Sequence, residues 1–524
     1  MKRLLSILFA YLALILFPLV LNAGDTIPPE NEISHNLQVK LFPDEHRMVV
    51  KDTLTIPVTA RQEFHFLLHR GLGPKSPTPG VIIKKETDGH EKILFDSFKV
   101  ILPAGLRTFT LEYHGSIFHP IEAFGNEQAR GFSQTPGIIS EDMVYLAGSS
   151  YWYPVFDSKL ISFSLQVELP HPWDAVSQGE RTEHFKNEDK TLVQWESPEP
   201  QDEIFLIASR FTEYLGHAGQ VTAMAFLRSP DKELANKYLE ATTRYIAMYE
   251  KLIGPYPYKK FALVENFWET GFGMPSFTLL GSRVIRLPFI INSSYPHEIL
   301  HNWWGNSVFP DYNSGNWSEG LTAYLSDHLI REQQGSAAEY RQTTLQKYAD
   351  YVLSERDFPL TEFRSRHSSS SEAIGYGKSL MFFHMLRQEL GDKTFTAGLQ
   401  DFYLKNKFGF ASFNDLRKSF ERVSQKKLET EFDQWVRRKG APKIRIVSTK
   451  LEKEGDGYGL SIGIEQTQAE DTYLLQIPVA VTMEGEARAW QTVVKMDKKR
   501  IDMHIHLPSR PLRVDIDPEF DLFR

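Results

Sequence analysis

The sequence contains no cysteine in its 524 residues. Disulfides and lipid attachment at a cysteine are therefore excluded. It also has no excess of positive charge, because 67 Asp and Glu outnumber 59 Lys and Arg and give a formal net charge of −8. This balance argues against nucleic acid as a partner. No internal repeat or low-complexity tract is present either, and a composition of 41% hydrophobic and 24% charged residues is that of an ordinary globular protein.

One long apolar run stands at the beginning of the chain. Lys2 and Arg3 precede this run, which starts at Leu4, and Ala23 follows it. The layout predicts that residues 1–23 are a secretory signal peptide, with an uncleaved N-terminal membrane anchor as the alternative. An exported chain without cysteine fits a bacterial periplasm or cell envelope, because secreted animal proteins of this size usually carry disulfides.

The chain is organised around an H-E-x-x-H pattern at residues 297–301. In a helix, His297 and His301 share one face, so both imidazoles can reach one metal ion. Glu298 can flank that metal without binding it and act as a base for metal-bound water. Chance gives about 0.04 such matches in a chain of this composition. The alternative is a helix with two ordinary histidines.

A catalytic zinc needs a third protein ligand and one open position. Trp304 and Ser307 stand where the metzincin pattern requires Gly and His, which excludes that group of enzymes. Glu319 is the better candidate because it opens a second helix, which a short loop can bring back to the first. Asp311 is the next candidate. Without a metal, Glu319 would be an ordinary acidic residue in a first helical turn.

The motifs at 297–306 and 317–320 resemble the zinc signature of the aminopeptidase N and leukotriene hydrolase family of gluzincins. The loop between His301 and Glu319 is one residue shorter than is usual in that family. The resemblance covers about residues 245–442. It implies a thermolysin-like, mainly helical catalytic domain in which His297, His301 and Glu319 hold one Zn²⁺ per chain.

The resemblance also implies substrate contacts. Tyr376, in a Y-x-K run at the start of a helix, matches a family tyrosine that faces the metal-bound carbonyl, and it is expected to stabilise the oxyanion. Gly273 and Met274 match an edge strand that binds substrate backbone, although an ordinary turn before a core strand is the alternative. The family has a G-x-M-E-N run here, whose Glu holds the substrate's free amino terminus. Pro275 stands at that Glu and Ser276 at the Asn.

The chain as a whole predicts an α+β multidomain protein. Alternating apolar residues favour an antiparallel β domain over residues 31–215, and helical spacing dominates the catalytic domain at 216–442. Alternation returns in a β-sandwich at 443–524. The predicted function is an exported zinc metallopeptidase that acts on peptide or protein substrates, with Glu298 and Tyr376 as catalytic residues. The alternative is a non-catalytic envelope binding protein that keeps the fold.

Overall fold

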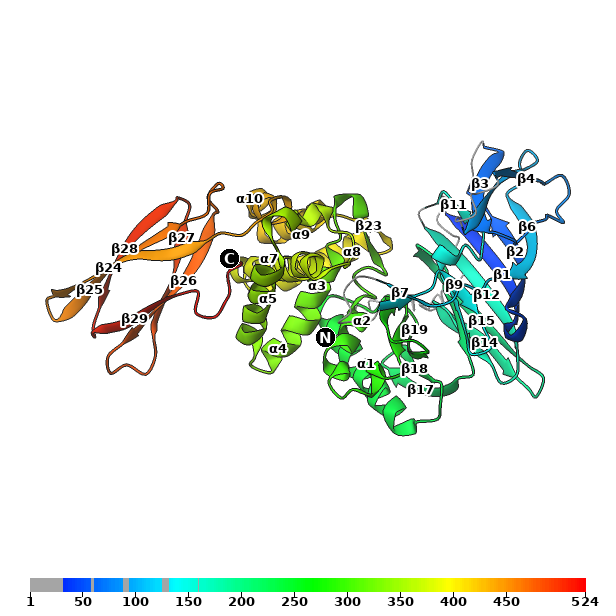
Figure 1. The fold of residues 1–524 in the computed structure, drawn as a ribbon, viewed down its shortest axis with the longest axis horizontal. Helices are drawn as coiled ribbons and strands as arrows, with labels where there is room; N and C mark the ends of the chain where they lie inside the picture. Colours follow the sequence, from blue (N-terminus) through cyan, green and yellow to red (C-terminus); the bar gives the residue numbers. More distant parts are fainter. Residues whose placement is uncertain (1–31, 58–60, 88–93, 125–131, 159) are drawn as a thin grey trace, which may run out of the picture.

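The computed structural model describes residues 32–57, 61–87, 94–124, 132–158 and 160–524. The molecule is elongated, with a β-rich part, a mainly helical part and a small β part following one another along its long axis (Figure 1). This arrangement confirms the predicted α+β multidomain class. The predicted signal segment, 1–23, lies outside the described residues. Among the helices that the structure describes, none combines the length and apolar character needed to cross a membrane.

The N-terminal part consists mainly of antiparallel sheets. Its largest sheet has the strand order β14-β15-β12-β1-β2-β6, in which β1 and β12 pair in parallel. Leu37, Val39 and Leu41 of β1 are buried while the residues between them are exposed, so the alternation in the sequence marks the inward face of this sheet. Further sheets have the orders β13-β16-β10-β9, β11-β3-β5-β4 and β7-β8. The strands are β1 (Ile33–Phe42), β2 (Arg47–Thr55), β3 (Glu63–His69), β4 (Ile82–Thr87), β5 (Phe95–Ile101), β6 (Thr108–Ser116), β7 (Glu122–Phe124), β8 (Phe132–Gln134), β9 (Gly137–Ile139), β10 (Met143–Leu146), β11 (Val155–Phe156), β12 (Ile161–Pro170), β13 (Asp174–Val176), β14 (Glu180–Lys186), β15 (Lys190–Gln201) and β16 (Leu206–Ser209).

The central part begins with a mixed sheet in the order β17-β18-β19-β21-β20. Its three inner strands run parallel, and the edge strands β17 and β20 pair antiparallel with their neighbours. The strands are β17 (Thr212–Ala218), β18 (Val221–Leu227), β19 (Lys260–Asn266), β20 (Gly271–Met274) and β21 (Phe277–Gly281). The domain boundary expected between residues 215 and 216 falls inside β17. Because β17 belongs to the central sheet, we count the central part from Thr212.

This central sheet is covered on both faces. Phe261 and Leu263 of β19 pack into the apolar core that contains helix α1 (Lys232–Leu252). Ala262 and Val264 pack into the core of the N-terminal part. Successive side chains of a strand point to opposite faces, so β19 alternates between the two cores. The edge strand β20 therefore lies where the N-terminal and central parts meet.

Helices follow the sheet, and two of the longer helical runs contain π-helical turns. The segment η6 (Tyr324–His328) joins α3 to α4, and η9 (Ala373–Lys378) joins α6 to α7. The remaining described elements of this part are η3 (Val284–Arg286), η4 (Ile290–Asn292), α2 (Ser294–Leu300), β22 (Val308–Pro310), η5 (Tyr312–Ser314), α3 (Ser318–Ala323), α4 (Leu329–Gln333), α5 (Ala337–Tyr351), η7 (Ser354–Arg356), η8 (Leu360–Glu362), α6 (Ser369–Glu372), α7 (Ser379–Leu390), α8 (Asp392–Asn406), β23 (Gly409–Ala411), α9 (Phe413–Ser424), α10 (Glu429–Phe432) and η10 (Asp433–Arg437).

The C-terminal part consists of two three-stranded antiparallel sheets, β24-β25-β28 and β27-β26-β29. Ile462 and Ile464 of one sheet and Ile477 and Val479 of the other are buried in one apolar cluster, as in a β-sandwich. The strands are β24 (Ile444–Glu454), β25 (Gly457–Gln466), β26 (Leu475–Met483), β27 (Trp490–Met496), β28 (Arg500–Leu507) and β29 (Pro511–Ile516).

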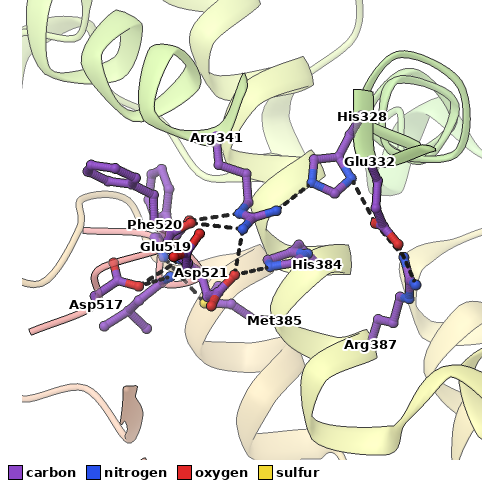
Figure 2. A network of polar contacts seen from close by, with 12 residues as sticks. His328, Glu332, Arg341, His384, Met385, Arg387, Asp517, Glu519, Phe520 and Asp521 are labelled. Carbon is purple, nitrogen blue, oxygen red and sulfur yellow. Dashed lines mark hydrogen bonds and ion pairs between the residues drawn. The ribbon is translucent and has the colours of Figure 1, made fainter. Parts of the chain in front are cut away.

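The segment after β29 returns to the helices of the central part (Figure 2). Asp521 accepts a hydrogen bond from Nε2 of His384 at 2.9 Å and pairs with Nη2 of Arg341 at 2.8 Å. Nη1 of Arg341 lies 2.9 Å from Nε2 of His328. Phe523 is fully buried, and its ring packs edge-on against that of Tyr348 on α5, with the ring centroids 4.8 Å apart. This segment therefore fastens the C-terminal sheets to α5, α7 and η6.

Candidate active site

The H-E-x-x-H residues lie on helix α2 and its last turn. His297 and Glu298 are within α2, and His301 caps it with helical backbone angles of φ −55° and ψ −19°. The N–H of His301 donates to the carbonyl of His297 at 3.2 Å, so the helical spacing of four residues is kept. The ring centroids of the two histidines are 4.8 Å apart. Both imidazoles thus lie side by side on one face.

Glu319 meets these imidazoles from the first turn of α3. Its Oε2 lies 3.7 Å from Nε2 of His297 and 3.5 Å from Nε2 of His301. All three potential ligand atoms lie within 4.8 Å of one another. In the described part of the chain, this buried Oε2 has no hydrogen-bond partner. Buried polar atoms are normally satisfied, and two imidazole nitrogens with one carboxylate oxygen are a donor set that Zn²⁺ accepts. The residues therefore fit a zinc ion.

The second nitrogen of each histidine is also held. Nδ1 of His301 donates to the carbonyl of Trp304 at 2.9 Å, and Nδ1 of His297 lies 3.4 Å from Oδ2 of Asp327. Such partners fix the tautomer and the orientation of a metal-binding imidazole. As a result, both rings present Nε2 towards Glu319.

Asp327 is a site residue that the sequence reasoning missed. It follows Glu319 by eight positions, which in a regular α-helix would turn it about 80° away from that face. A π-helix has more residues per turn than an α-helix, so the π-helical turn η6 brings Asp327 back to the helix face of Glu319. An acidic residue two turns beyond Glu319 was the available signal. Asp311, the alternative third ligand, instead accepts a hydrogen bond from the N–H of Asn313 at 3.2 Å.

The edge strand β20 runs directly past the carboxylate of Glu298. A Cβ added at Gly273 would lie 2.7 Å from Oε2 of Glu298 and 3.0 Å from Cβ of His301, so a side chain would collide there. A Cβ added at Gly271 would lie 3.5 Å from Oε1 of Glu298. The side chain of Met274 is buried in the core of the N-terminal part, and its predicted contact with a substrate stays a prediction. Met274 can meet a substrate only through its backbone.

Tyr376 lies on η9 and faces the same site. Its ring is 6.3 Å from that of His297 and nearly parallel to it, at 14°. A Cβ added at Gly320 would lie 2.0 Å from Oγ of Ser379, which shows how closely α3 approaches the start of α7. This contact brings Tyr376 to Glu319. Burial and the negative charge of Glu319 raise the pKa of Tyr376 well above its usual value, so its hydroxyl remains a donor.

The two carboxylates of the site differ in their affinity for protons. Burial raises the pKa of Glu298, although His297 and His301 partly oppose this shift. Burial also disfavours the charge on Glu319, but the same two histidines hold its pKa well below the usual value. Glu319 is thus the ionised ligand, and Glu298 is the group better suited to accept a proton.

Residues 238–435 match the family model described as "Peptidase family M1 domain". The central domain is a peptidase family M1 domain. The match begins within α1 and ends within η10, and it contains the metal-binding motif, Glu319 and Tyr376. The resemblance found in the sequence is thereby confirmed at the level of the family.

Curated proteins that are similar to this chain include aminopeptidases from a fungus and an archaeon. "Aminopeptidase 2, mitochondrial" of Saccharomyces cerevisiae is 23% identical over 323 residues, which cover 56% of this chain and 33% of that protein. "Probable aminopeptidase 2" of Sulfurisphaera tokodaii is 22% identical over 360 residues, which cover 62% of this chain and 45% of that protein. The chain thus spans between a third and a half of the length of these relatives.

A solved structure extends the likeness beyond the M1 domain. Legionella pneumophila aminopeptidase A, in complex with aspartic acid, matches with a TM-score of 0.69 at 14% identity and covers 94% of this chain. The chain covers 58% of that structure. At this identity the similarity is one of fold, and it includes the β-rich parts on both sides of the M1 domain.

Proposed function

We propose that this chain is a zinc-dependent peptidase that hydrolyses bonds in peptide or protein substrates. The observation that carries the proposal is the convergence of His297, His301 and Glu319 beside Glu298. The three converging residues would hold one ion per chain. When bound, Zn²⁺ supplies a Lewis acid that polarises the scissile carbonyl and makes water a nucleophile near neutral pH.

The chain's own residues then have separate tasks. Glu298, whose pKa is raised, accepts the proton of the attacking water and delivers it to the leaving nitrogen. Tyr376 donates its hydroxyl hydrogen to the developing oxyanion. Strand β20 offers its backbone to an extended peptide, and the missing side chain at Gly273 lets that peptide approach closely.

We further propose that substrates need no free amino terminus. Pro275 and Ser276, which stand at the Glu and Asn of the family motif, form the tight turn between β20 and β21 and provide no carboxylate. Glu265 is already engaged, because its Oε1 pairs with Nη1 of Arg286 at 2.7 Å. Glu269 accepts hydrogen bonds from backbone N–H groups of the next segment. An unpaired ammonium is costly to desolvate, so blocked or internal peptide bonds should be cut at least as well.

Export to a periplasm or cell envelope is also part of the proposal, and it rests on the basic and apolar pattern of residues 1–23. The mass of the protein from a fractionated host tests it. Loss of about the first 23 residues supports a signal peptide. An intact N-terminus in the membrane fraction supports an anchor, and an intact N-terminus in the soluble cytoplasmic fraction contradicts export.

The activity test compares an aminoacyl substrate with its N-acetylated form on the zinc-loaded protein. We expect the acetylated form to be cut at least equally well. Glu298→Gln should retain zinc while turnover falls roughly a hundredfold or more. A strong preference for the free amine would overturn the amino-terminus proposal. Equal turnover in wild type and Glu298→Gln would refute the base assignment, whereas zinc binding without any hydrolysis would favour a non-catalytic envelope binding protein.

A further inference from the structure

The turn that joins β20 to β21 is buried and has an unusual backbone. Ser276 is fully buried and has a φ of +65°. This left-handed region is uncommon for residues other than glycine, asparagine and aspartate. A serine therefore stays there only if its surroundings hold it.

Every polar atom of Ser276 has a partner. Its N–H donates to Oδ1 of Asn302 at 2.7 Å. Its carbonyl accepts from Nζ of Lys260 at 3.0 Å, and its hydroxyl oxygen accepts from the same Nζ at 2.9 Å. The hydroxyl oxygen also accepts from the N–H of Gly179 at 3.0 Å. The turn is thus held from three directions.

Lys260 is a buried cation whose hydrogen-bond acceptors carry no formal charge. Its third acceptor is the carbonyl of Ser177 at 2.8 Å, so all three ammonium hydrogens are used. The rings of Trp195 and Phe277 lie 4.9 and 5.0 Å from Nζ. Burial lowers the pKa of Lys260 well below its usual value, which reflects the cost of keeping a charge here. An apolar side chain would fill this space at a lower cost in free energy. The presence of an ammonium group therefore indicates a role for Lys260 at the turn.

The held turn is connected to the metal-binding motif. Asn302, which receives the N–H of Ser276, directly follows His301. Further along the same loop, Nδ2 of Asn306 donates to the carbonyl of Gly273 at 3.1 Å. Strand β20 is therefore fastened to this loop at Gly273 and again at its terminal turn. Any movement of the turn would shift the strand relative to Glu298.

We propose that Lys260 and Ser276 are positioning residues that hold strand β20 in register with the metal-binding motif, ready to receive an extended peptide. This inference rests on the proposed peptidase function and adds how the substrate strand is preorganised. A strand fixed before binding spares the substrate the cost of ordering it. Since Ser177 and Gly179 belong to the N-terminal part, that part contributes to substrate binding from behind the turn.

The test variant is Ser276→Gly. Glycine adopts a φ of +65° freely, so this change removes the hydroxyl without straining the turn. Loss of its hydrogen bonds should raise KM for an N-acetylated octapeptide of glycine, alanine and leucine about threefold to tenfold, with kcat and zinc content unchanged. A short aminoacyl arylamide, which covers less of β20, should show a smaller change. Lys260→Met should act in the same direction.

The control is Ser419→Ala, which removes another buried hydroxyl of the central part, on helix α9. It should leave KM unchanged even if Tm falls. A direct measurement titrates the Glu298→Gln protein, with and without Ser276→Gly, with the same octapeptide carrying fluorescein. Weaker binding in the double variant supports the positioning role even if the wild type proves to hydrolyse nothing, a result that would refute only the proposed function.

Equal KM and equal Kd with and without the Ser276 hydroxyl would overturn the inference. The same holds if neither protein binds the octapeptide, because the strand would then have no peptide to receive. A parallel fall in Tm and zinc content at unchanged KM would reduce Ser276 to a structural role. If Lys260→Met fails to fold, the results for Ser276→Gly alone decide whether the positioning role holds.

Discussion

Single residues around the metal position hold the histidine rings in place. Asp327→Asn removes the negative charge beside Nδ1 of His297 and should weaken zinc binding about ten- to a hundredfold. Glu319→Ala should weaken it further, because a direct ligand is lost. Competition with a chelator of known affinity measures both. Asp311→Asn, at a carboxylate that accepts a hydrogen bond from Asn313 of its own loop, is the matched control. An unchanged affinity in Glu319→Ala would require a different third ligand.

The proposed role of the Tyr376 hydroxyl, to stabilise the oxyanion, can be tested separately from metal binding. Tyr376→Phe keeps the ring that stacks on His297 and removes the proposed oxyanion donor. We expect kcat to fall roughly a hundredfold, as for other single oxyanion donors, with little change in KM and full zinc content. Steady-state kinetics over a range of substrate concentrations separates the two constants. A raised KM at constant kcat would assign Tyr376 to ground-state binding instead.

At the scale of elements, the approach of α3 to α7 depends on a missing side chain. A Cβ at Gly320 would lie 2.0 Å from Oγ of Ser379 and 3.0 Å from the carbonyl of Gly375. Gly320→Ala gains about 1 kcal/mol of helix propensity, but overpacking costs about 1–3 kcal/mol, so unfolding in urea should show a net loss. Adding Ser379→Gly should recover part of it. A single variant as stable as wild type would show that the helices adjust freely.

The elements themselves were largely readable in the sequence, whereas their irregularities were not. The α2 helix and the turn into the helix of Glu319 follow from local spacing and turn residues, which act within a few positions. The edge strand β20 was implied by the family resemblance, since local pattern alone also allowed an ordinary turn. Asp327 was missed because the π-helical turn η6 changes the helical repeat, and no local pattern announces it. The burial of the Met274 side chain could not be predicted either, because the sequence does not show that a second core, from the N-terminal part, lies behind β20.

At the scale of the whole molecule, the site lies where two apolar cores meet. The central sheet packs against α1 on one face and against the N-terminal sheets on the other. Ligand sites favour such junctions between domains, because the two domains together supply a set of groups that neither has alone. Here the helical side supplies the candidate metal ligands, while Ser177 and Gly179 of the β-rich side hold the turn of β20.

The opposite end of the M1 domain is tied to the C-terminal sheets through Asp521 (Figure 2). Burial alone would raise the pKa of this carboxyl, but the hydrogen bond from His384 and the charge of Arg341 hold it below its usual value. A carboxyl with a lowered folded pKa adds stability above its unfolded pKa of about 3.9 and loses this contribution as pH falls through the folded value.

Asp521→Asn should therefore lower the free energy of unfolding by about 2 kcal/mol at pH 7, the usual worth of hydrogen bonds to a charged group. The difference between wild type and variant should shrink as pH falls below about 4, since Asp521 then takes up a proton first in the unfolded state and, at lower pH, in the folded state. Urea unfolding at several pH values measures it. Asp502→Asn, at an exposed ion pair with Arg500 on the same sandwich, should show no measurable change. A difference that stays constant down to pH 2 would mean that Asp521 contributes by its shape and not by its charge.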